Sequence, residues 1–270
     1  MYALRQIVLL VLIGLAPLTG ALAQDVVGSI TDGAGEILVI RSGNEQAASV
    51  GTEIQQYDEV YVGEDGEATI TFVDDTLLTL SGGSAMTIDE FVYDPSSQAN
   101  SGLFTLAGGV IGLVSGDMLK TGDMTVTTPV STIGIRGTTV LIDSGTSVRR
   151  IQGGGYSVTT TTQTGETVTL VLSRDGTLGL VTVTNASGQS TTLRVFGDTV
   201  TTTTVNGGAI QLKSTLTPAD LNAKYGNTLR ALRRATGKDL GDPANAVLRD
   251  NLQNFLEDVI DDIEDDPSPQ

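Results

Sequence analysis

Residues 127–140 read TTPVSTIGIRGTTV, the most distinctive pattern in a chain dominated by Gly, Thr and Val. Pro129 blocks a helix and biases the preceding residue towards an extended backbone. Ile133, Ile135 and Val140 indicate strand pieces, separated by glycines that allow the backbone to bend. The stretch therefore predicts a bent, buried junction in a β domain.

Arg136 lies in this stretch between Gly134 and Gly137, where other backbone can approach closely. It could present its guanidinium to an acidic ligand or partner. Alternatively, it could be buried and hydrogen-bond carbonyl groups or an acid across the fold, because a buried Arg must be paired. We favour the second interpretation, in which Arg136 is an internal tie that locks the bend.

Short strands separated by turns are predicted on the N-terminal side of this stretch, from Val26 onwards. Residues 37–40 form a compact apolar run, Ile-Leu-Val-Ile. In residues 68–73, Ala, Ile and Phe alternate with Thr, Thr and Val, which indicates a half-buried strand of period two. Asp74-Asp75-Thr76 follows as a turn. The pattern indicates an all-β body, either a sandwich or a solenoid-like stack, because both give short alternating strands and frequent Gly turns.

Two groups of residues give the chain a resemblance to the FecR domain family. The first group is Asp58, Val62, Gly63, Ala68, Ile70, Phe72, Asp74, Asp75, Thr76 and Leu80. The second and more specific group is Thr128, Pro129, Gly134, Ile135, Arg136, Gly137 and Thr138, which we interpret as a structural motif. The resemblance covers Val26 to Asp143 and implies an exported all-β domain that recognises a protein or ligand in the bacterial envelope.

The chain departs from the FecR pattern at three positions. Tyr57 stands where the family has Gly, Val62 where it has Thr, and Asp75 where it has Gly. The family's iron-uptake regulators also carry a cytoplasmic anti-sigma segment, a membrane helix and a C-terminal secretin/TonB-type small domain. None of these is recognised in this sequence, so the resemblance does not carry over control of a sigma factor.

The composition divides the chain into five parts. Residues 1–23 form a signal peptide, with an apolar region from Ile7 to Leu15 and an Ala-Leu-Ala cleavage site before Gln24. Residues 24–143 form the FecR-like domain, and residues 144–214 form a Thr/Gly-rich β extension. Residues 215–266 form amphipathic helices and residues 267–270 a disordered tail. We therefore expect a periplasmic or secreted protein with no transmembrane segment after cleavage.

Two helices are predicted at the C-terminal end. The first begins at Thr217-Pro218-Ala219-Asp220, with a hydroxyl cap, Pro and an acid in the first turn, and ends at Gly237. The second, residues 243–264, carries an apolar stripe and an acidic end. The basic first helix and the acidic second helix could form a short hairpin, or each could dock separately on the β domain. The stripe of 243–264 could also bind an envelope protein.

Composition excludes several classes of function. The chain has 32 acidic and 15 basic residues and a formal net charge of −17, which argues against binding to nucleic acid or anionic lipid. It has no His and no Cys, so zinc sites built on those ligands and Ser-His or Cys-His dyads cannot form. Asp74-Asp75 and Asp261-Asp262 could offer oxygen ligands to calcium, but neither matches an EF-hand loop.

The leading hypothesis is therefore a non-catalytic exported protein with no cofactor, which acts as a protein- or ligand-binding or scaffold module in the cell envelope. A second hypothesis is a surface adhesion or matrix component with the Thr-rich strands as a stalk. A third is a carbohydrate-active hydrolase, which needs only two well-placed carboxylates. No acidic pair in the sequence is marked out for that role.

Overall fold

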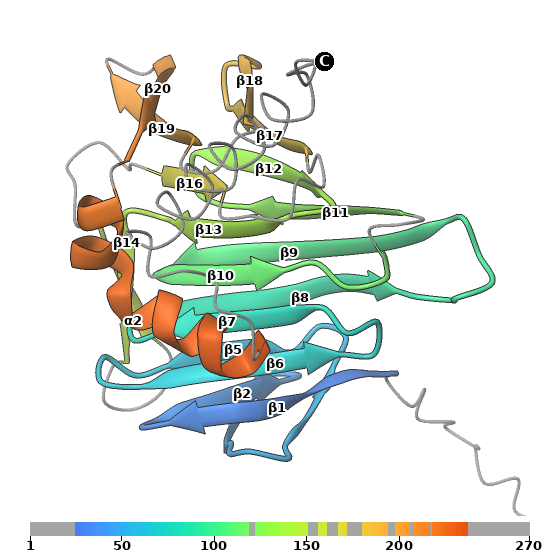
Figure 1. Cartoon of the computed structure of the whole chain (residues 1–270). Helices are drawn as coiled ribbons and strands as arrows, with labels where there is room; N and C mark the ends of the chain where they lie inside the picture. Colours follow the sequence, from blue (N-terminus) through green and yellow to red (C-terminus); the bar gives the residue numbers. More distant parts are fainter. Residues whose placement is uncertain are drawn as a thin grey trace, which may run out of the picture.

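The protein is a β-sandwich with one outer face covered by a helix (Figure 1). The computed structural model describes residues 25–118, 122–150, 156–160, 167–171, 180–193, 198–205, 208–216 and 218–236. In this part of the chain, two nine-stranded sheets lie face to face. Sheet A has the order β20-β19-β16-β13-β10-β7-β6-β1-β4, and sheet B has the order β18-β17-β12-β11-β9-β8-β5-β2-β3. The predicted all-β body is confirmed, and it is a sandwich.

The elements have the following bounds. Sheet A contains β1 Val26–Ala34, β4 Glu53–Gln55, β6 Glu67–Phe72, β7 Leu77–Ser81, β10 Val110–Val114, β13 Thr139–Asp143, β16 Thr167–Val171, β19 Asp198–Val205 and β20 Gly208–Thr215. Sheet B contains β2 Ile37–Arg41, β3 Asn44–Ala47, β5 Glu59–Val62, β8 Ser84–Val92, β9 Asn100–Gly108, β11 Gly122–Thr127, β12 Ser131–Arg136, β17 Leu180–Asn185 and β18 Ser190–Leu193. Outside the two sheets are the hairpin β14 Thr146–Arg150 and β15 Tyr156–Thr160, and the helix α2 Pro218–Thr236.

The chain moves from one end of the sandwich to the other as it alternates between the sheets. Strand numbers rise almost steadily along both sheets, so each strand pairs mainly with strands close to it in sequence. Every pairing is antiparallel except that of β9 with β11, which are joined through β10 in the opposite sheet. The molecule thus combines the facing sheets of a sandwich with the stepwise advance of a solenoid.

One apolar core fills the space between the sheets along their length. Near the N-terminal end, the rings of Phe72 and Phe91 stack with centroids 4.6 Å apart, and Phe104 packs edge-on against Phe72 at 5.5 Å. Towards the other end, Val183 of β17 and Val200 of β19 belong to the same buried cluster. The Thr/Gly-rich extension therefore lengthens the sandwich and shares its core.

Helix α2 covers part of the outer face of sheet A, over β6, β7 and β10; the outer face is the one turned away from sheet B (Figure 1). Its buried side chains Leu221, Tyr225, Leu229 and Leu232 pack on Leu141, Val110 and Val114. Close approach depends on Gly112 of β10, because a Cβ there would lie 2.5 Å from Leu232 Cδ1. The predicted start at Pro218 with Asp220 in the first turn is confirmed, and the last turn carries Arg233 and Arg234; Thr217 and Gly237 lie outside the described residues.

The helix changes the burial of the strands beneath it. Thr69 of β6 was expected on a solvated face, but it is buried under α2 and its hydroxyl lies 3.1 Å from that of Thr79. Tyr225 Oη donates to Asp143 Oδ2 at 3.1 Å, and Arg234 pairs with Asp32 and Glu67. Thus α2 uses its single apolar stripe entirely on sheet A.

Hairpin β14–β15 leaves the sandwich and lies over part of the outer face of sheet B. Val148 packs on Leu38, Tyr61 and Ala85, and its N–H donates to the Gly83 carbonyl at 2.9 Å. The signal peptide 1–23, the helix 243–264, the tail 267–270 and Asp261-Asp262 lie outside the described residues. Within the described part, no helix is both long and apolar enough to span a bilayer.

Candidate binding surface

The motif that contains Arg136 is divided between a hairpin turn and a strand. Thr128 and Ser131 close the β11–β12 turn around exposed Pro129, because Thr128 N–H donates to the Ser131 carbonyl at 2.8 Å and Ser131 N–H donates to Thr128 Oγ1 at 3.1 Å. β12 then runs through the middle of sheet B. Gly137, at φ +63°, makes the turn that carries the chain over to sheet A. Thr138 is buried immediately after it.

The expectation that Arg136 is a buried tie is wrong. Ile133 and Ile135 point into the core, so the alternation of the strand turns Thr132, Gly134 and Arg136 outwards. Arg136 is exposed, and the described residues offer its guanidinium no hydrogen bond or ion pair. Gly134 does not give close backbone approach either, because a Cβ there would meet only the Thr182 carbonyl oxygen at 3.9 Å.

A buried arginine tie exists elsewhere, between Arg41 of β2 and Asp58. Arg41 Nε donates to Asp58 Oδ1 at 2.8 Å and Arg41 Nη2 donates to Oδ2 at 2.6 Å. The Gln55 N–H also donates to Oδ2 at 2.8 Å. Asp58 is fully buried, and its hydrogen bond to Arg41 raises the pKa of that guanidinium. The sequence held a signal for this pair, because Arg41 shares the core-facing side of β2 with Ile37 and Val39.

Asp74, another acid of the first FecR group, also has a structural role, because it fixes a turn. Its Oδ1 accepts from Thr76 N–H at 2.9 Å, and its Oδ2 accepts from Thr76 Oγ1 at 2.7 Å and from Met118 N–H at 3.0 Å. These bonds fix the turn after β6 against residues 116–118. The next residue, Asp75, is exposed. No group of three or more potential metal-ligating side chains occurs in the described segments.

Two departures from the FecR pattern coincide with unusual backbone. Tyr57 has φ +68° and Asp75 has φ +65°, and both stand where the family has Gly. An L side chain is strained in this region, whereas Gly is not. Tyr57 is also 61% exposed, so little packing offsets its strain. The FecR glycines are therefore explained by backbone geometry at these two turns.

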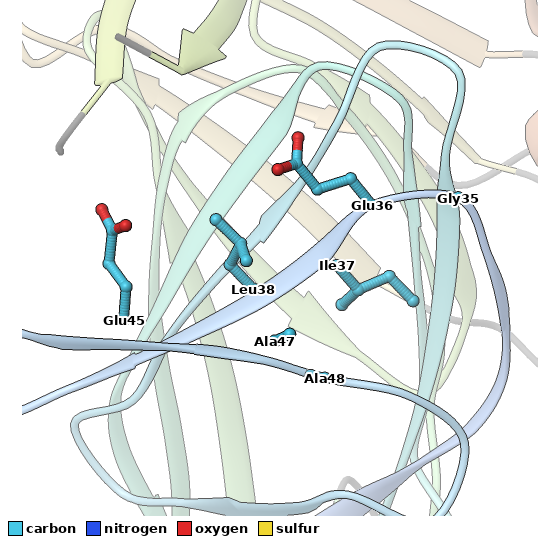
Figure 2. Close-up of a pocket in the computed structure, with 7 residues that line it drawn as sticks. All are labelled: Gly35, Glu36, Ile37, Leu38, Glu45, Ala47 and Ala48. Atoms are coloured by element: carbon cyan, nitrogen blue, oxygen red, sulfur yellow. The ribbon is translucent and has the colours of Figure 1, made fainter. Parts of the chain in front are cut away.

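Two of the grooves on the described part of the surface have the following linings. One lies along β2 and β3 and is lined by Gly35, Glu36, Ile37, Leu38, Glu45, Ala47 and Ala48. Figure 2 shows the carboxylates of Glu36 and Glu45 on the same side as Leu38, while Ile37 points the other way. The other groove lies between α2 and the β6–β7 region, and its lining includes Asp65, Arg230 and Arg234, of which Arg234 pairs with Glu67.

A polar surface is formed by the outer face of sheet B beyond hairpin β14–β15. Hydroxyl side chains lie opposite one another on six consecutive strands, and we name them the hydroxyl row. The row consists of Thr87, Thr105, Thr127, Thr132, Thr184 and Ser190. Neighbouring strands lie about 4.8 Å apart, so the row is a closely spaced array. Thr184 and Ser190 hydroxyls are 2.8 Å apart.

Arg136 lies two residues along β12 from Gly134 and four from Thr132 of the hydroxyl row, with half-buried Leu180 opposite it on β17. Exposed Leu103 stands on β9 opposite Thr125. A guanidinium with no partner among the described residues, the hydroxyl row and exposed Leu103 thus share one face. This face, residues 87–192 of β8, β9, β11, β12, β17 and β18, is named the B face. It was missed in the sequence because cross-strand register is not visible there.

Two carboxylates at the N-terminal border of the B face are poorly satisfied. Glu59 Oε1 and Asp89 Oδ2 are buried and have no hydrogen-bond donor among the described residues. Burial raises the pKa of the Glu59 carboxyl. Glu59 stands opposite Thr87, the first member of the hydroxyl row.

The comparison with protein families agrees with the motif and the fold. Residues 58–155 match the family described as FecR protein. This part of the chain is similar to the FecR domain. The match begins at the buried acid Asp58 and passes through the whole β12 motif. Comparison with curated proteins finds no match.

Among solved structures, two crystal structures named "putative anti-sigma factor" from Parabacteroides distasonis are similar to this chain at 15% and 16% identity. Each match covers 67% of this chain and 75% of that chain, with TM-scores of 0.39 and 0.40. A structure named "Cell surface anchoring domain" is 32% identical over 23% of this chain and 82% of that chain, with a TM-score of 0.22. At these scores the likenesses carry no argument about function.

Proposed function

We propose that this protein is a non-catalytic, exported FecR-domain protein that binds a protein partner in the bacterial envelope through the B face. The observation that carries the proposal is the exposed Arg136, which has no partner among the described residues and lies on one sheet face with the hydroxyl row. Such a guanidinium suits an acidic group on a partner. An open sheet face with hydroxyls and Leu103 suits a broad protein surface better than a small molecule, which needs a concave site.

The acids of the FecR motif support a non-catalytic protein. Asp58 forms an ion pair with Arg41, and Asp74 accepts hydrogen bonds within the turn at Thr76. Neither carboxylate is therefore available to a substrate. The chain has no His or Cys to act as base, nucleophile or metal ligand. The predicted signal peptide 1–23 supports a periplasmic or secreted location.

The test uses the full chain immobilised on beads and exposed to envelope extract. We expect Arg136→Met to weaken capture of the partner at least tenfold while the thermal midpoint stays unchanged, because the side chain is exposed and makes no hydrogen bond or ion pair to the described residues. The matched control is Arg230→Met, an exposed arginine on α2 over the other sheet. Equal capture by both variants would refute recognition through the B face.

A second binding element is proposed in residues 243–264. Because α2 buries its apolar stripe on sheet A, it cannot also cover the stripe predicted in 243–264. Truncation after Thr236 tests this element. If the truncated chain captured no partner while Arg136→Met captured it as wild type does, recognition would be assigned to the C-terminal segment. A polysaccharide hydrolysis screen on the same preparations addresses the enzymatic alternative, since turnover abolished by one acid-to-amide change would overturn the non-catalytic assignment.

A further inference from the structure

The two sheets have four edges, and one of them is unlike the others. β3, β4 and β18 are edge strands of three or four residues. Short edge strands offer few backbone groups to another chain. β20, the edge of sheet A, is eight residues long and contains no Pro. It is therefore the longest open template for strand pairing in the described part of the molecule.

The hydrogen bonds of Ala209 show which backbone groups of β20 face outwards. Ala209 N–H donates to Ser187 Oγ at 3.1 Å, and its carbonyl accepts from Asn185 Nδ2 at 3.0 Å. These bonds lead away from β19. Because the direction alternates along an antiparallel strand, the groups of Gln211 and Lys213 face outwards as well. Within the described residues, the outward N–H and C=O groups of Gln211 and Lys213 have no partner.

The side chains hold this edge rigid and make its outer face apolar. Gln211 Nε2 donates to the Val183 carbonyl at 2.9 Å, and its Oε1 accepts from Thr191 Oγ1 at 2.6 Å, so the strand is anchored to sheet B. Ile210 and Leu212 point to the other side and are 41% and 59% exposed. A fixed strand with exposed apolar side chains loses little conformational entropy when it pairs.

Charge selects a second copy of this chain as the occupant. Repulsion between two molecules of net charge −17 opposes their association over most of the surface. Residues 198–215 hold one acid and one base, Asp198 and Lys213, which pair with each other at 3.1 Å. Two copies that meet at β20 therefore meet at a neutral end. By contrast, the B face carries the unpaired Arg136 and is a different surface.

We propose that two copies of this chain associate edge to edge through β20, antiparallel, with Leu212 opposite the same residue of the second copy. This register pairs the outward groups of Gln211 with those of Lys213 on the other copy, and it covers the most exposed apolar side chain of the edge. Placing Lys213 opposite itself would set like charges against each other. Placing Gln211 opposite itself would require the groups of Ala209, which Asn185 and Ser187 already occupy.

Cysteine cross-linking tests the register, because the chain has no cysteine of its own. In the proposed pair, Leu212 and its counterpart form a non-hydrogen-bonded pair with Cα atoms about 4.5 Å apart, within disulfide range. L212C should give a covalent dimer of the full chain under mild oxidation. The matched control I210C should not, because its two copies lie about 13 Å apart in this register. Equal cross-linking of both variants, or none of L212C, would overturn the register.

Light scattering on the full chain tests the association itself. Wild type is expected to be a dimer. K213P removes an outward N–H that β19 does not use, and an edge strand tolerates Pro, so this variant should be monomeric with an unchanged circular dichroism spectrum. K213A, which loses the same pair with Asp198 but keeps the N–H, should remain a dimer. A monomeric wild type at the highest soluble concentration, or a dimeric K213P, would overturn the proposal.

Discussion

Arg41 and Arg136 both stand at the C-terminal end of a strand of sheet B, yet they have opposite environments. Arg41 lies on the same side of β2 as the core residues Ile37 and Val39. Its side chain is 26% exposed and binds the fully buried Asp58. Arg136 comes directly after the core residue Ile135 and therefore lies on the opposite side of β12. It is exposed to solvent and has no partner among the described residues. The difference shows that the face of the strand decides whether an arginine is a tie or a contact residue. Flanking glycines do not.

The largest effect is expected from breaking the tie at Asp58. Asp58→Ala removes the buried carboxylate, strands the guanidinium of Arg41 and leaves the Gln55 N–H without its acceptor. The free energy of unfolding should fall by about 3 kcal/mol, as for other broken buried pairs. Urea denaturation measures the change.

A double variant then separates the tie from simple packing. Arg41→Met with Asp58→Leu should recover much of the stability lost by either single change, because no uncompensated charge remains. If Asp58→Ala costs no more than an exposed substitution, the contrast between the two arginines collapses.

A smaller effect, of opposite sign, is expected at the neighbouring turn. Tyr57→Gly relieves φ +68° at an exposed position and should raise the free energy of unfolding by about 1 kcal/mol. Val73→Gly is the matched control, because Val73 is 57% exposed and is not among the residues with positive φ. It should lower stability. A loss in both variants would show that Tyr57 makes a contribution that outweighs its strain.

Glu59 should make stability depend on pH. Burial raises its pKa, so the folded chain binds that proton more tightly than the unfolded chain. Its contribution to stability is therefore present below the ordinary carboxyl pKa and is lost as pH rises through the raised value. Glu59→Gln should leave stability unchanged at pH 3 and raise it by less than about 1 kcal/mol at pH 7, since the group is only half buried. Thermal midpoints at both pH values measure the difference, and an equal gain at both would exclude titration of Glu59 as the cause.

The smallest effect on stability is expected at Arg136. Arg136→Met should change the free energy of unfolding by no more than about 0.5 kcal/mol, as is usual for an exposed side chain with no partner. Differential scanning calorimetry of Arg136→Met and Asp58→Ala under the same conditions compares the stability that each arginine environment contributes. A loss comparable to that of Asp58→Ala would restore the internal tie that the sequence suggested.

Much of the fold follows from local sequence. The alternation at residues 68–72, the apolar run at 37–40 and the Pro218 helix start are visible because each depends on neighbours in the chain. The burial of Thr69 is not visible, because it depends on α2 arriving from far along the chain.

The candidate surface was harder to predict, for two different reasons. The outward direction of Arg136 could have been found, since Ile133 and Ile135 fix the core side of β12. The hydroxyl row could not, because it depends on the register of six strands that only the folded sheet establishes. Similarly, the sequence does not explain why the FecR pattern has Gly at the positions of Tyr57 and Asp75. The reason is visible only in the structure, where both residues have positive φ.

The almost steady rise of strand numbers along both sheets also bears on how the molecule forms and changes length. Most strands pair with strands a few elements earlier in the chain, which limits the loop-closure entropy of those steps, whereas the pairing of β12 with β17 closes a longer loop. The part already folded offers its free edge as the template for the next strands, so assembly can follow synthesis from the N-terminal end. The same arrangement allows strand pairs to be gained or lost at the far end without disturbing the FecR domain, as repeats are gained or lost in modular arrays.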